Sequence, residues 1–232
     1  MIMLTGGSGR LGTEIQKIMG VWAPSQKEFD ITAIGGAQAR DIRNQVLLII
    51  HAAAYTNVDQ AEKERELCYQ TNVIGTRNVV RIGVPVLYIS TDSVFDGEAG
   101  DYAESDIPYP RNFYSMTKLL AEQEIREGAI IRCSPRSRPW DREGAFTDRF
   151  FSAEYMDETA RHIKRAAAIF KMLPRIVHVG SARRSHYEMA LLSKPDVRAV
   201  QGEDPSGLPR GKNGVWRGRD LSLDCSLWRA LK

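Results

Sequence analysis

The sequence has little cysteine, no long hydrophobic run and no metal-binding pattern. Its three cysteines are widely spaced without a C-x-x-C pair, which argues against a disulfide framework or a zinc ribbon and favours a reducing compartment, the cytoplasm. The longest apolar run, residues 46–54, is too short to span a bilayer. The four histidines lack metal-ligand spacing. The first residues reach glycine without a basic leader, so we expect no secretory signal. From the short apolar run and the histidine spacing we expect no membrane segment and no metal site.

Charge is unevenly distributed along the 232 residues. The net charge of +3 is too small to indicate a nucleic-acid partner. Residues 1–131 hold 12 basic and 17 acidic side chains, whereas residues 132–232 hold 20 basic and 12 acidic ones. A basic second half suits an anionic ligand, although on charge alone a solvated arginine-rich surface is the simpler explanation. The length allows one domain with a small lobe, and 43% hydrophobic residues suffice for a core.

Short apolar runs alternate with helical patterns along the first half of the chain. The continuous runs 46–51 and 85–90 are typical of strands buried on both faces. Further strands are expected at 1–4, 21–23, 129–133 and 175–179, and helices at 10–19, 37–45, 58–82, 113–127, 155–170 and 186–192. This order predicts an α/β fold with a Rossmann-type doubly wound parallel sheet and a small C-terminal lobe. Residues 93–112 and 202–218 are expected to be loops.

The first predicted strand runs into a glycine-rich turn, TGGSGRLG, at residues 5–12. Its glycines fit G-x-G-x-x-G between a strand and a helix, and glycines let backbone N–H groups approach a diphosphate. The turn therefore predicts a dinucleotide site rather than a mere tight turn. Residues 23–27 lack the carboxylate that holds the ribose in NAD sites, whereas Arg10, Ser25 and Lys27 suit a 2′-phosphate. The sequence thus favours NADPH, with NADH as the alternative.

Tyr114 and Lys118 are four residues apart, so they share one face of a predicted helix. An ammonium group beside a phenol lowers the phenol pKa toward the range of an acid–base catalyst. Upstream, Ser90-Thr91-Asp92 ends a predicted buried strand, at the sheet edge where open parallel sheets bind ligands. The Thr91 hydroxyl can hydrogen-bond a substrate carbonyl or alcohol there. A plain surface pair on a helix is the alternative, but it does not explain three features in this order.

Together these motifs resemble those of the extended short-chain dehydrogenase/reductases. HAAAYTNVDQAE (51–62), ISTDSVFDG (89–97), YAESDIPYP (102–110) and FYSMTKLLAE (113–122) are similar, more narrowly, to the dTDP-4-dehydrorhamnose reductase family. The resemblance implies an NAD(P)-binding Rossmann domain over residues 1–133 and a nucleotide-sugar lobe over residues 134–232, partly interleaved with it. The lobe is shorter than is typical of the family, and the sequence departs from the family pattern at Ser93, Ser115 and 133–135.

The resemblance also implies residue roles. Tyr114 would donate a proton to the 4-keto oxygen of a nucleotide-activated deoxysugar, Lys118 would hold the nicotinamide ribose and lower the tyrosine pKa, and Thr91 would orient the carbonyl. The expected cofactor-binding residues are Gly6, Gly9, Arg10, Leu11, Gly12, Asp30, Ala52, Ala53, Ala54, Tyr55, Asn72, Ser90 and Lys118. The expected substrate-binding residues are Ser93, Val94, Phe95, Arg132 and Arg184. Guanidinium chemistry makes Arg136, Arg138, Arg142 and Arg183 further candidate phosphate ligands beside Arg132 and Arg184, although a solvated loop explains any single one of these arginines equally well.

Two alternatives stay open at this point. A nucleotide-sugar epimerase or dehydratase would keep NAD tightly bound, and Cys133 could supply its second acid or base, although a buried thiol is the simpler role. A non-catalytic nucleotide-sugar-binding subunit would explain the short lobe, but it would not need Thr91, Tyr114 and Lys118 together. A homodimer is expected by analogy with the family.

Overall fold

The computed structural model describes residues 1–202 and 215–231 and is built around a five-stranded parallel sheet. The strand order is β1-β2-β3-β4-β9, and the bounds are β1 Ile2–Thr5, β2 Leu48–His51, β3 Val86–Thr91, β4 Gly128–Cys133 and β9 Ile176–His178. All neighbouring strands pair in parallel, so the predicted Rossmann-type sheet is confirmed. Since β9 follows residue 133, the central sheet draws on both of the predicted domains.

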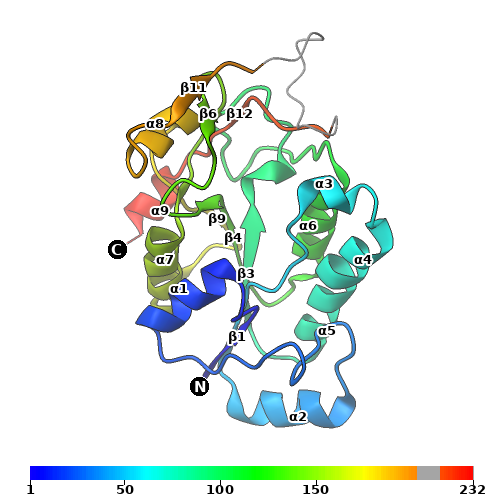
Figure 1. Ribbon diagram of the computed structural model, residues 1–232. Helices are drawn as coiled ribbons and strands as arrows, with labels where there is room; N and C mark the ends of the chain where they lie inside the picture. The colour runs from blue at the N-terminus through cyan, green and yellow to red at the C-terminus, as the bar shows by residue number, and fades with distance from the viewer. Residues whose placement is uncertain (203–214, 232) are drawn as a thin grey trace.

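Helices cover both faces of this sheet (Figure 1). One face carries α1 Arg10–Ile18, α7 Met156–Ala168 and α9 Ser226–Ala230, and the other carries α2 Gly36–Gln45, α5 Gly75–Arg81 and α6 Phe113–Glu124. Successive side chains of β2 point to opposite faces of the sheet. Leu48 and Ile50 therefore pack with α1 and α7, whereas Ile49 packs with α2 and α5. α3 Val58–Ala61, α4 Arg65–Tyr69 and a π-helical turn, Gln70–Ile74, precede α5. Within the described residues, no helix is both long enough and apolar enough to cross a membrane.

Successive segments of the chain pair with opposite edges of β1, so the strand order reverses direction there. Trp22 donates its N–H to the Ile2 carbonyl at 2.9 Å and its carbonyl accepts from the Leu4 N–H at 2.8 Å, while β2 pairs in parallel with the other edge of β1. The strand expected at 21–23 is therefore a single bridge, because Pro24 has no N–H with which to extend it. The carboxyl ends of the strands at such a reversal form the crevice in which open α/β sheets bind ligands.

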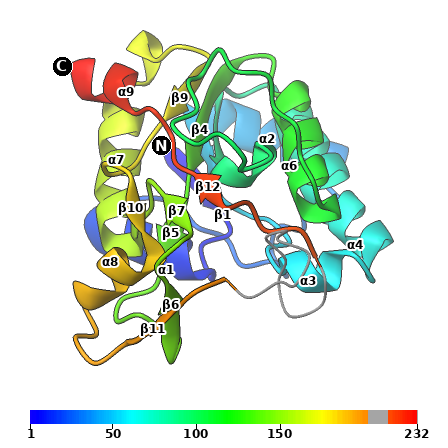
Figure 2. The same ribbon diagram turned by 90° about the horizontal axis from the view of Figure 1, so that it is seen from above.

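Small strands build the lobe above this crevice (Figure 2). β7 Phe150–Phe151 lies between β10 Arg184–Ser185 and β12 Asp220–Leu221, and the remaining pairs are β6 Gly144–Phe146 with β11 Arg198–Val200 and β5 Pro135–Arg136 with β8 Glu154–Tyr155. α8 His186–Leu191 follows β10. These strands are too short to leave a periodic signal in the sequence. Of the loop expected at 202–218, residues 203–214 lie outside the described residues.

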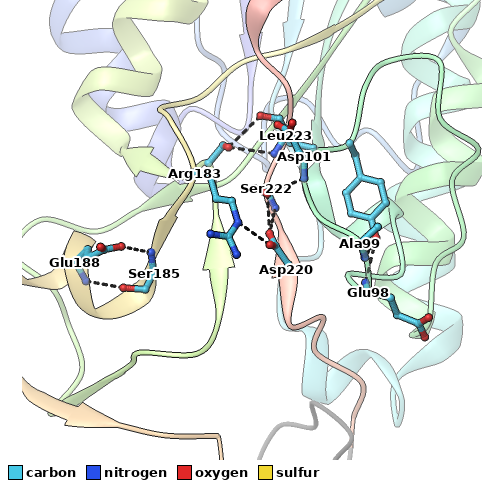
Figure 3. A network of polar contacts seen from close by, with 11 residues as sticks. Glu98, Ala99, Asp101, Arg183, Ser185, Glu188, Asp220, Ser222 and Leu223 are labelled. Carbon is cyan, nitrogen blue, oxygen red and sulfur yellow. Dashed lines mark hydrogen bonds and ion pairs between the residues drawn. The ribbon is translucent and has the colours of Figure 1, made fainter.

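Polar contacts fix the segment that contains β12 (Figure 3). Arg183 Nε donates to Asp220 Oδ2 at 2.7 Å, and Asp220 Oδ1 accepts from Ser222 Oγ at 2.6 Å. Ser222 Oγ in turn accepts from the Asp101 N–H at 2.7 Å. The long loop after β3 and the β10 region are thereby joined through residues far downstream in the chain.

Candidate active site

The glycine-rich turn has the geometry that a diphosphate site requires. Gly6 adopts a φ of +78°, and a Cβ atom there would lie 2.6 Å from the Ala53 nitrogen. The Gly9 N–H donates to the Gly6 carbonyl at 3.0 Å, and α1 begins at the next residue. A Cβ atom on Gly12 would collide with the Gly6 carbonyl oxygen. The absence of side chains leaves the N-terminus of α1 accessible from the cleft.

A single cleft of about 1620 Å³ joins this turn to the carboxyl ends of β2 and β3 and to the lobe. Most of the predicted site residues line it: Gly6, Gly9, Arg10, Leu11, Gly12, Asp30, Ala52, Ala53, Ala54, Ser90, Thr91, Ser93, Phe95, Tyr114 and Lys118. The predicted residues that do not line it are Tyr55, Asn72, Val94, Arg132 and Arg184. Val94 is a core residue, fully buried with Phe95, Tyr102 and Leu223.

Asn72 positions the chain beside the predicted cofactor site instead of lining it. Its Oδ1 accepts from the Tyr55 N–H at 2.8 Å, and its Nδ2 donates to the Tyr55 carbonyl at 3.2 Å and to Thr117 Oγ1 at 2.9 Å. The segment after β2 is thereby held against α6 by a side chain that is 1% exposed.

Arg10 and Asp30, at the far end of the cleft, are already hydrogen-bonded. Arg10 Nη1 donates to Ser137 Oγ at 2.7 Å and lies 3.4 Å from Asp141 Oδ2, but its side chain remains 71% exposed. Asp30 Oδ1 accepts from the backbone N–H and the hydroxyl of Thr32 at 2.8 and 2.7 Å. Arg10 can therefore turn toward a ligand without leaving a buried group unpaired.

The three predicted catalytic side chains line the same cleft. Asn112 Oδ1 caps α6 by accepting the Ser115 N–H at 2.8 Å, which starts the helix so that Tyr114 and Lys118 both face β3. Lys118 Nζ donates to the Ile89 carbonyl at 2.8 Å and lies 4.1 Å from the centre of the Tyr88 ring. Thr91, Tyr114 and Lys118 are 8%, 9% and 3% exposed, so water is largely excluded from them.

The electrostatics of the tyrosine differ from the prediction. Burial, followed by the charge of Asp92, raises the pKa of Tyr114 instead of lowering it. Burial lowers the pKa of Lys118 to about 8, against the opposing charge of Glu122. At neutral pH the phenol is therefore protonated and can act as a proton donor.

Arg132 does not reach the cleft. Its guanidinium group is 2% exposed and binds Glu122 through Nε–Oε1 at 3.0 Å and Nη2–Oε2 at 2.7 Å. A buried arginine held by a carboxylate is not available to a phosphate, so the predicted phosphate role of Arg132 is wrong. Arg184, in β10, also lies outside the cleft wall. Arg138 stacks on the Tyr155 ring at 4.2 Å and pairs with Asp157.

Arginines other than Arg132, Arg138 and Arg184 line the cleft. Arg136, Arg142, Arg149 and Arg217 all line the lobe side of the cleft. Burial lowers the pKa of Arg136 against the opposing charge of Asp92, and the charges of Arg142 and Arg217 lower it further. Burial likewise lowers the pKa of Arg149. Burial and three of these arginines also lower the pKa of His186. Mutually repelling cations around one cavity favour an anionic ligand. Arg149 and Arg217 were missed by the sequence analysis, and only the basic excess after residue 131 hinted at them.

His51 and Cys133 are both buried, and the structural role that the sequence favours for Cys133 is confirmed. His51 lies between Thr5 Oγ1 at 2.6 Å and Thr76 Oγ1 at 2.9 Å, and burial lowers its pKa to about 3, so it is neutral. Burial raises the pKa of the Cys133 thiol to about 12, which leaves it protonated and unsuited to be a base. In the described part of the chain, no three or more His, Cys, Asp or Glu side chains are grouped to hold a metal.

The fold and the site define a protein of the extended short-chain dehydrogenase/reductase class. A family profile described as "RmlD substrate binding domain" matches residues 1–134, and the chain belongs to this family.

The sequence relatives include proteins with different names. The dTDP-4-dehydrorhamnose reductase of Aggregatibacter actinomycetemcomitans is 32% identical over 152 residues, which cover 59% of this chain and 48% of that protein. The chain thus spans about half the length of this reductase. Methionine adenosyltransferase 2 subunit beta of Rattus norvegicus is 26% identical over an alignment covering 97% of this chain and 80% of that protein.

Solved structures match over nearly the whole chain. A hypothetical dTDP-4-dehydrorhamnose reductase from Sulfolobus tokodaii has a TM-score of 0.82 and 29% identity, covering 100% of this chain and 94% of that one. The Bacillus anthracis dTDP-4-dehydrorhamnose reductase in complex with NADP has a TM-score of 0.81 and 27% identity, covering 98% and 91%.

Proposed function

We propose that the protein is a reductase that uses NADPH to reduce the 4-keto group of a nucleotide-activated deoxysugar. The observation that carries this proposal is that Thr91, Tyr114 and Lys118 line the cleft that also contains the glycine-rich turn. The NADP complex of a similarly folded reductase supports the choice of cofactor. We place the enzyme in the cytoplasm, acting in deoxysugar and surface polysaccharide biosynthesis, as a homodimer.

The glycine-rich turn fits a dinucleotide because it keeps its backbone close-packed and open to the cleft, and added Cβ atoms at Gly6 and Gly12 would clash with the Ala53 backbone and with the Gly6 carbonyl oxygen. Gly9, Leu11 and the N-terminus of α1 would hold the diphosphate. Ala52 to Ala54, fixed through Asn72, would lie along the cofactor, and Arg10 would bind a 2′-phosphate. The cofactor, when bound, supplies the hydride.

The protein supplies positioning and a proton. Tyr114 holds its proton at neutral pH because its pKa is raised, so its hydroxyl can donate to the carbonyl oxygen of the sugar. Lys118 is held in place by the Ile89 carbonyl and the Tyr88 ring and would bond the cofactor ribose. Ser93 and Phe95 would contact the sugar from the loop after β3.

The lobe would bind the nucleotide diphosphate. Arg136 and Arg142 line the cleft, and a guanidinium group can bind phosphate oxygens with two parallel hydrogen bonds. Their like charges repel each other and Asp92 offsets only part of this charge, so a bound anion would relieve the repulsion. The nucleotide-sugar role thus moves from Arg132 and Arg184 to residues 136, 142 and 149.

NADPH oxidation against a panel of 4-keto nucleotide-sugars tests the proposal. We expect turnover with at least one of them and a lower KM for NADPH than for NADH. Failure with the whole panel would contradict the reductase function. A clear preference for NADH would contradict only the cofactor assignment.

A second candidate is a non-catalytic subunit of another enzyme. The alignment with methionine adenosyltransferase 2 subunit beta, which covers 97% of this chain, favours it. Binding of NADPH without turnover of any sugar in the panel would support this candidate. The epimerase or dehydratase alternative is weakened by the protonated Cys133, and it would require NAD that co-purifies with the protein.

A further inference from the structure

The hydroxyl group of Tyr102 organises a turn in the loop that follows β3. Its oxygen accepts hydrogen bonds from the backbone N–H groups of Gly97 at 3.1 Å, Glu98 at 3.0 Å and Ala99 at 3.1 Å, of which the last two residues are labelled in Figure 3. It donates its own proton to Asp96 Oδ1. Residues 97–99 lie in no helix or strand, so these three amides are gathered on one side-chain oxygen instead of a backbone ladder.

The ring of Tyr102 packs against a residue of the cleft wall. It stacks on Phe95 with the ring centres 4.3 Å apart and an interplanar angle of 4°. The Arg132 guanidinium group lies 5.1 Å from the centre of the same Phe95 ring. Phe95 lines the cleft, whereas Tyr102 is 8% exposed and does not. Tyr102 therefore fixes the loop from within the protein, at a place where the loop faces the ligand.

The same turn also holds a second stretch of the wall, which comes from the end of the chain. The Gly97 carbonyl accepts from the backbone N–H groups of Arg219 and Asp220, each at 2.9 Å. The Asp96 carbonyl accepts from Trp216 Nε1 at 2.8 Å. The residues of this segment that line the cleft are Trp216, Arg217, Gly218 and Leu221. The position of that segment thus depends on acceptors that the turn presents.

We propose that Tyr102 is a positioning residue for nucleotide-sugar binding. Its hydroxyl sets the turn at residues 97–99, which keeps Phe95 in one part of the wall and residues 216–221 in another. Tyr102 acts through these two segments and need not touch the ligand. The identity of the ligand rests on the proposed reductase function, whereas the dependence of both wall segments on one hydroxyl does not.

Tyr102→Phe tests the proposal because it keeps the stacked ring and removes only the oxygen. We expect the KM for a 4-keto nucleotide-sugar to rise about fivefold or more, while kcat and the dissociation constant for NADPH stay within about twofold of the parent. NADPH binding should be spared because the glycine-rich turn packs against Ala53, not against this loop. An unchanged KM, or an equal loss of NADPH affinity, would overturn the proposal.

Tyr155→Phe is the matched control. The Tyr155 hydroxyl is also buried, donates to the Met189 carbonyl at 2.8 Å and lies 2.6 Å from Ser193 Oγ, but Tyr155 lies outside the cleft wall. Its loss should lower the stability of the lobe and leave the KM within about twofold of the parent. An equal rise in KM for the two variants would overturn the specific role of Tyr102.

Amide hydrogen exchange of the free protein separates this inference from the proposed function. In Tyr102→Phe we expect the N–H groups of residues 97–99 to exchange about fivefold faster or more, and those of Arg219 and Asp220 to follow them. This result in a protein that turns over no 4-keto sugar would refute the reductase and support the role of Tyr102 in shaping the cleft. Unchanged exchange at Arg219 and Asp220 would overturn the proposal.

Gly97→Ala provides a second variant if Tyr102→Phe does not fold. Gly97 has a φ of +76°, and a Cβ atom there would collide with the Gly218 Cα atom, so the substitution separates the turn from the end segment without removing the hydroxyl. The KM for the nucleotide-sugar should again rise while the affinity for NADPH is kept. An unchanged KM in this variant would contradict the proposal.

Discussion

Arg132 and Glu122 form a bidentate ion pair inside the protein, with both side chains at most 2% exposed. Glu122 also accepts from Ser90 Oγ at 2.5 Å. One carboxylate on α6 thereby joins β3 to β4, one helical turn after Lys118. This pair holds α6, the helix that carries Tyr114 and Lys118, against the strand that ends in Thr91.

Breaking this pair should destabilise the fold. Arg132→Met leaves the Glu122 charge buried and unpaired, and we expect a loss of about 3–5 kcal/mol in the free energy of unfolding. The double variant Arg132→Met/Glu122→Leu should recover most of this loss, because no isolated charge remains. Denaturant unfolding of both variants measures the difference. A single variant as stable as the parent would contradict the assigned pairing.

Tyr114→Phe should remove the proton donor and leave the cleft otherwise unchanged. We expect kcat to fall by about 10²–10⁴-fold, the range of general acid catalysis, which would leave turnover close to undetectable. The dissociation constant for NADPH should stay close to that of the parent. Initial rates of NADPH oxidation measure kcat, and fluorescence titration measures the dissociation constant for NADPH. Full activity in this variant would refute the proposed mechanism.

Arg142→Ala should weaken nucleotide-sugar binding. Loss of one charge-assisted hydrogen bond costs about 1.5–3 kcal/mol, which is about 10- to 100-fold in KM. Arg138→Ala is the control, because its guanidinium group stacks on Tyr155 outside the cleft wall. Equal effects of the two substitutions on KM would show that the lobe arginines act through stability alone.

Binding of NADPH should weaken as pH rises through about 8, the lowered pKa of Lys118. Burial favours the neutral amine, so the ammonium that binds the cofactor is present below this pH and is lost above it. Dissociation constants measured from about pH 6.5 to about pH 9.5 give the profile. Lys118→Met should bind less tightly and show no such step, and a step that persists in this variant would exclude Lys118 as its origin.

Gly12→Ala should disrupt the cofactor turn, because the new Cβ atom meets the Gly6 carbonyl. Overpacking of this kind costs about 1–3 kcal/mol, and a turn displaced to relieve it should bind NADPH about 5- to 150-fold more weakly. Gly20→Ala is the matched control, since its Cβ would have no atom within 4 Å. NADPH affinity that is unchanged in Gly12→Ala would argue against diphosphate binding at this turn.

The sequence predicted those parts of the fold that rest on local patterns. The runs at 46–51 and 85–90 became β2 and β3, and the helix expected at 155–170 became α7. The glycine-rich turn and the position of Tyr114 and Lys118 on one face of a helix were likewise predictable from short stretches of sequence. Even here the helix expected at 113–127 ends at Glu124, because Ile125 turns to an extended backbone.

Side-chain partners across the fold could not be predicted. Arg132 follows a buried strand and looks like a phosphate ligand until α6 places Glu122 against it. The raised pKa of Tyr114 depends on burial and on Asp92, and neither is visible in the Tyr–Lys spacing. The arginines that line the cleft come from several segments of the lobe, whose strands of two or three residues carry no periodicity.

The segment after residue 214 has a consequence for how the protein is made. Trp216 Nε1 donates to the Asp96 carbonyl at 2.8 Å, Arg217 pairs with Asp59, and β12 completes the lobe sheet beside β7. The glycine-rich turn and the catalytic helix are synthesised much earlier. A nascent chain on the ribosome can therefore assemble the glycine-rich turn and the β3 edge of the cleft first, while the part of the lobe wall formed by Trp216, Arg217 and Leu221 is added last.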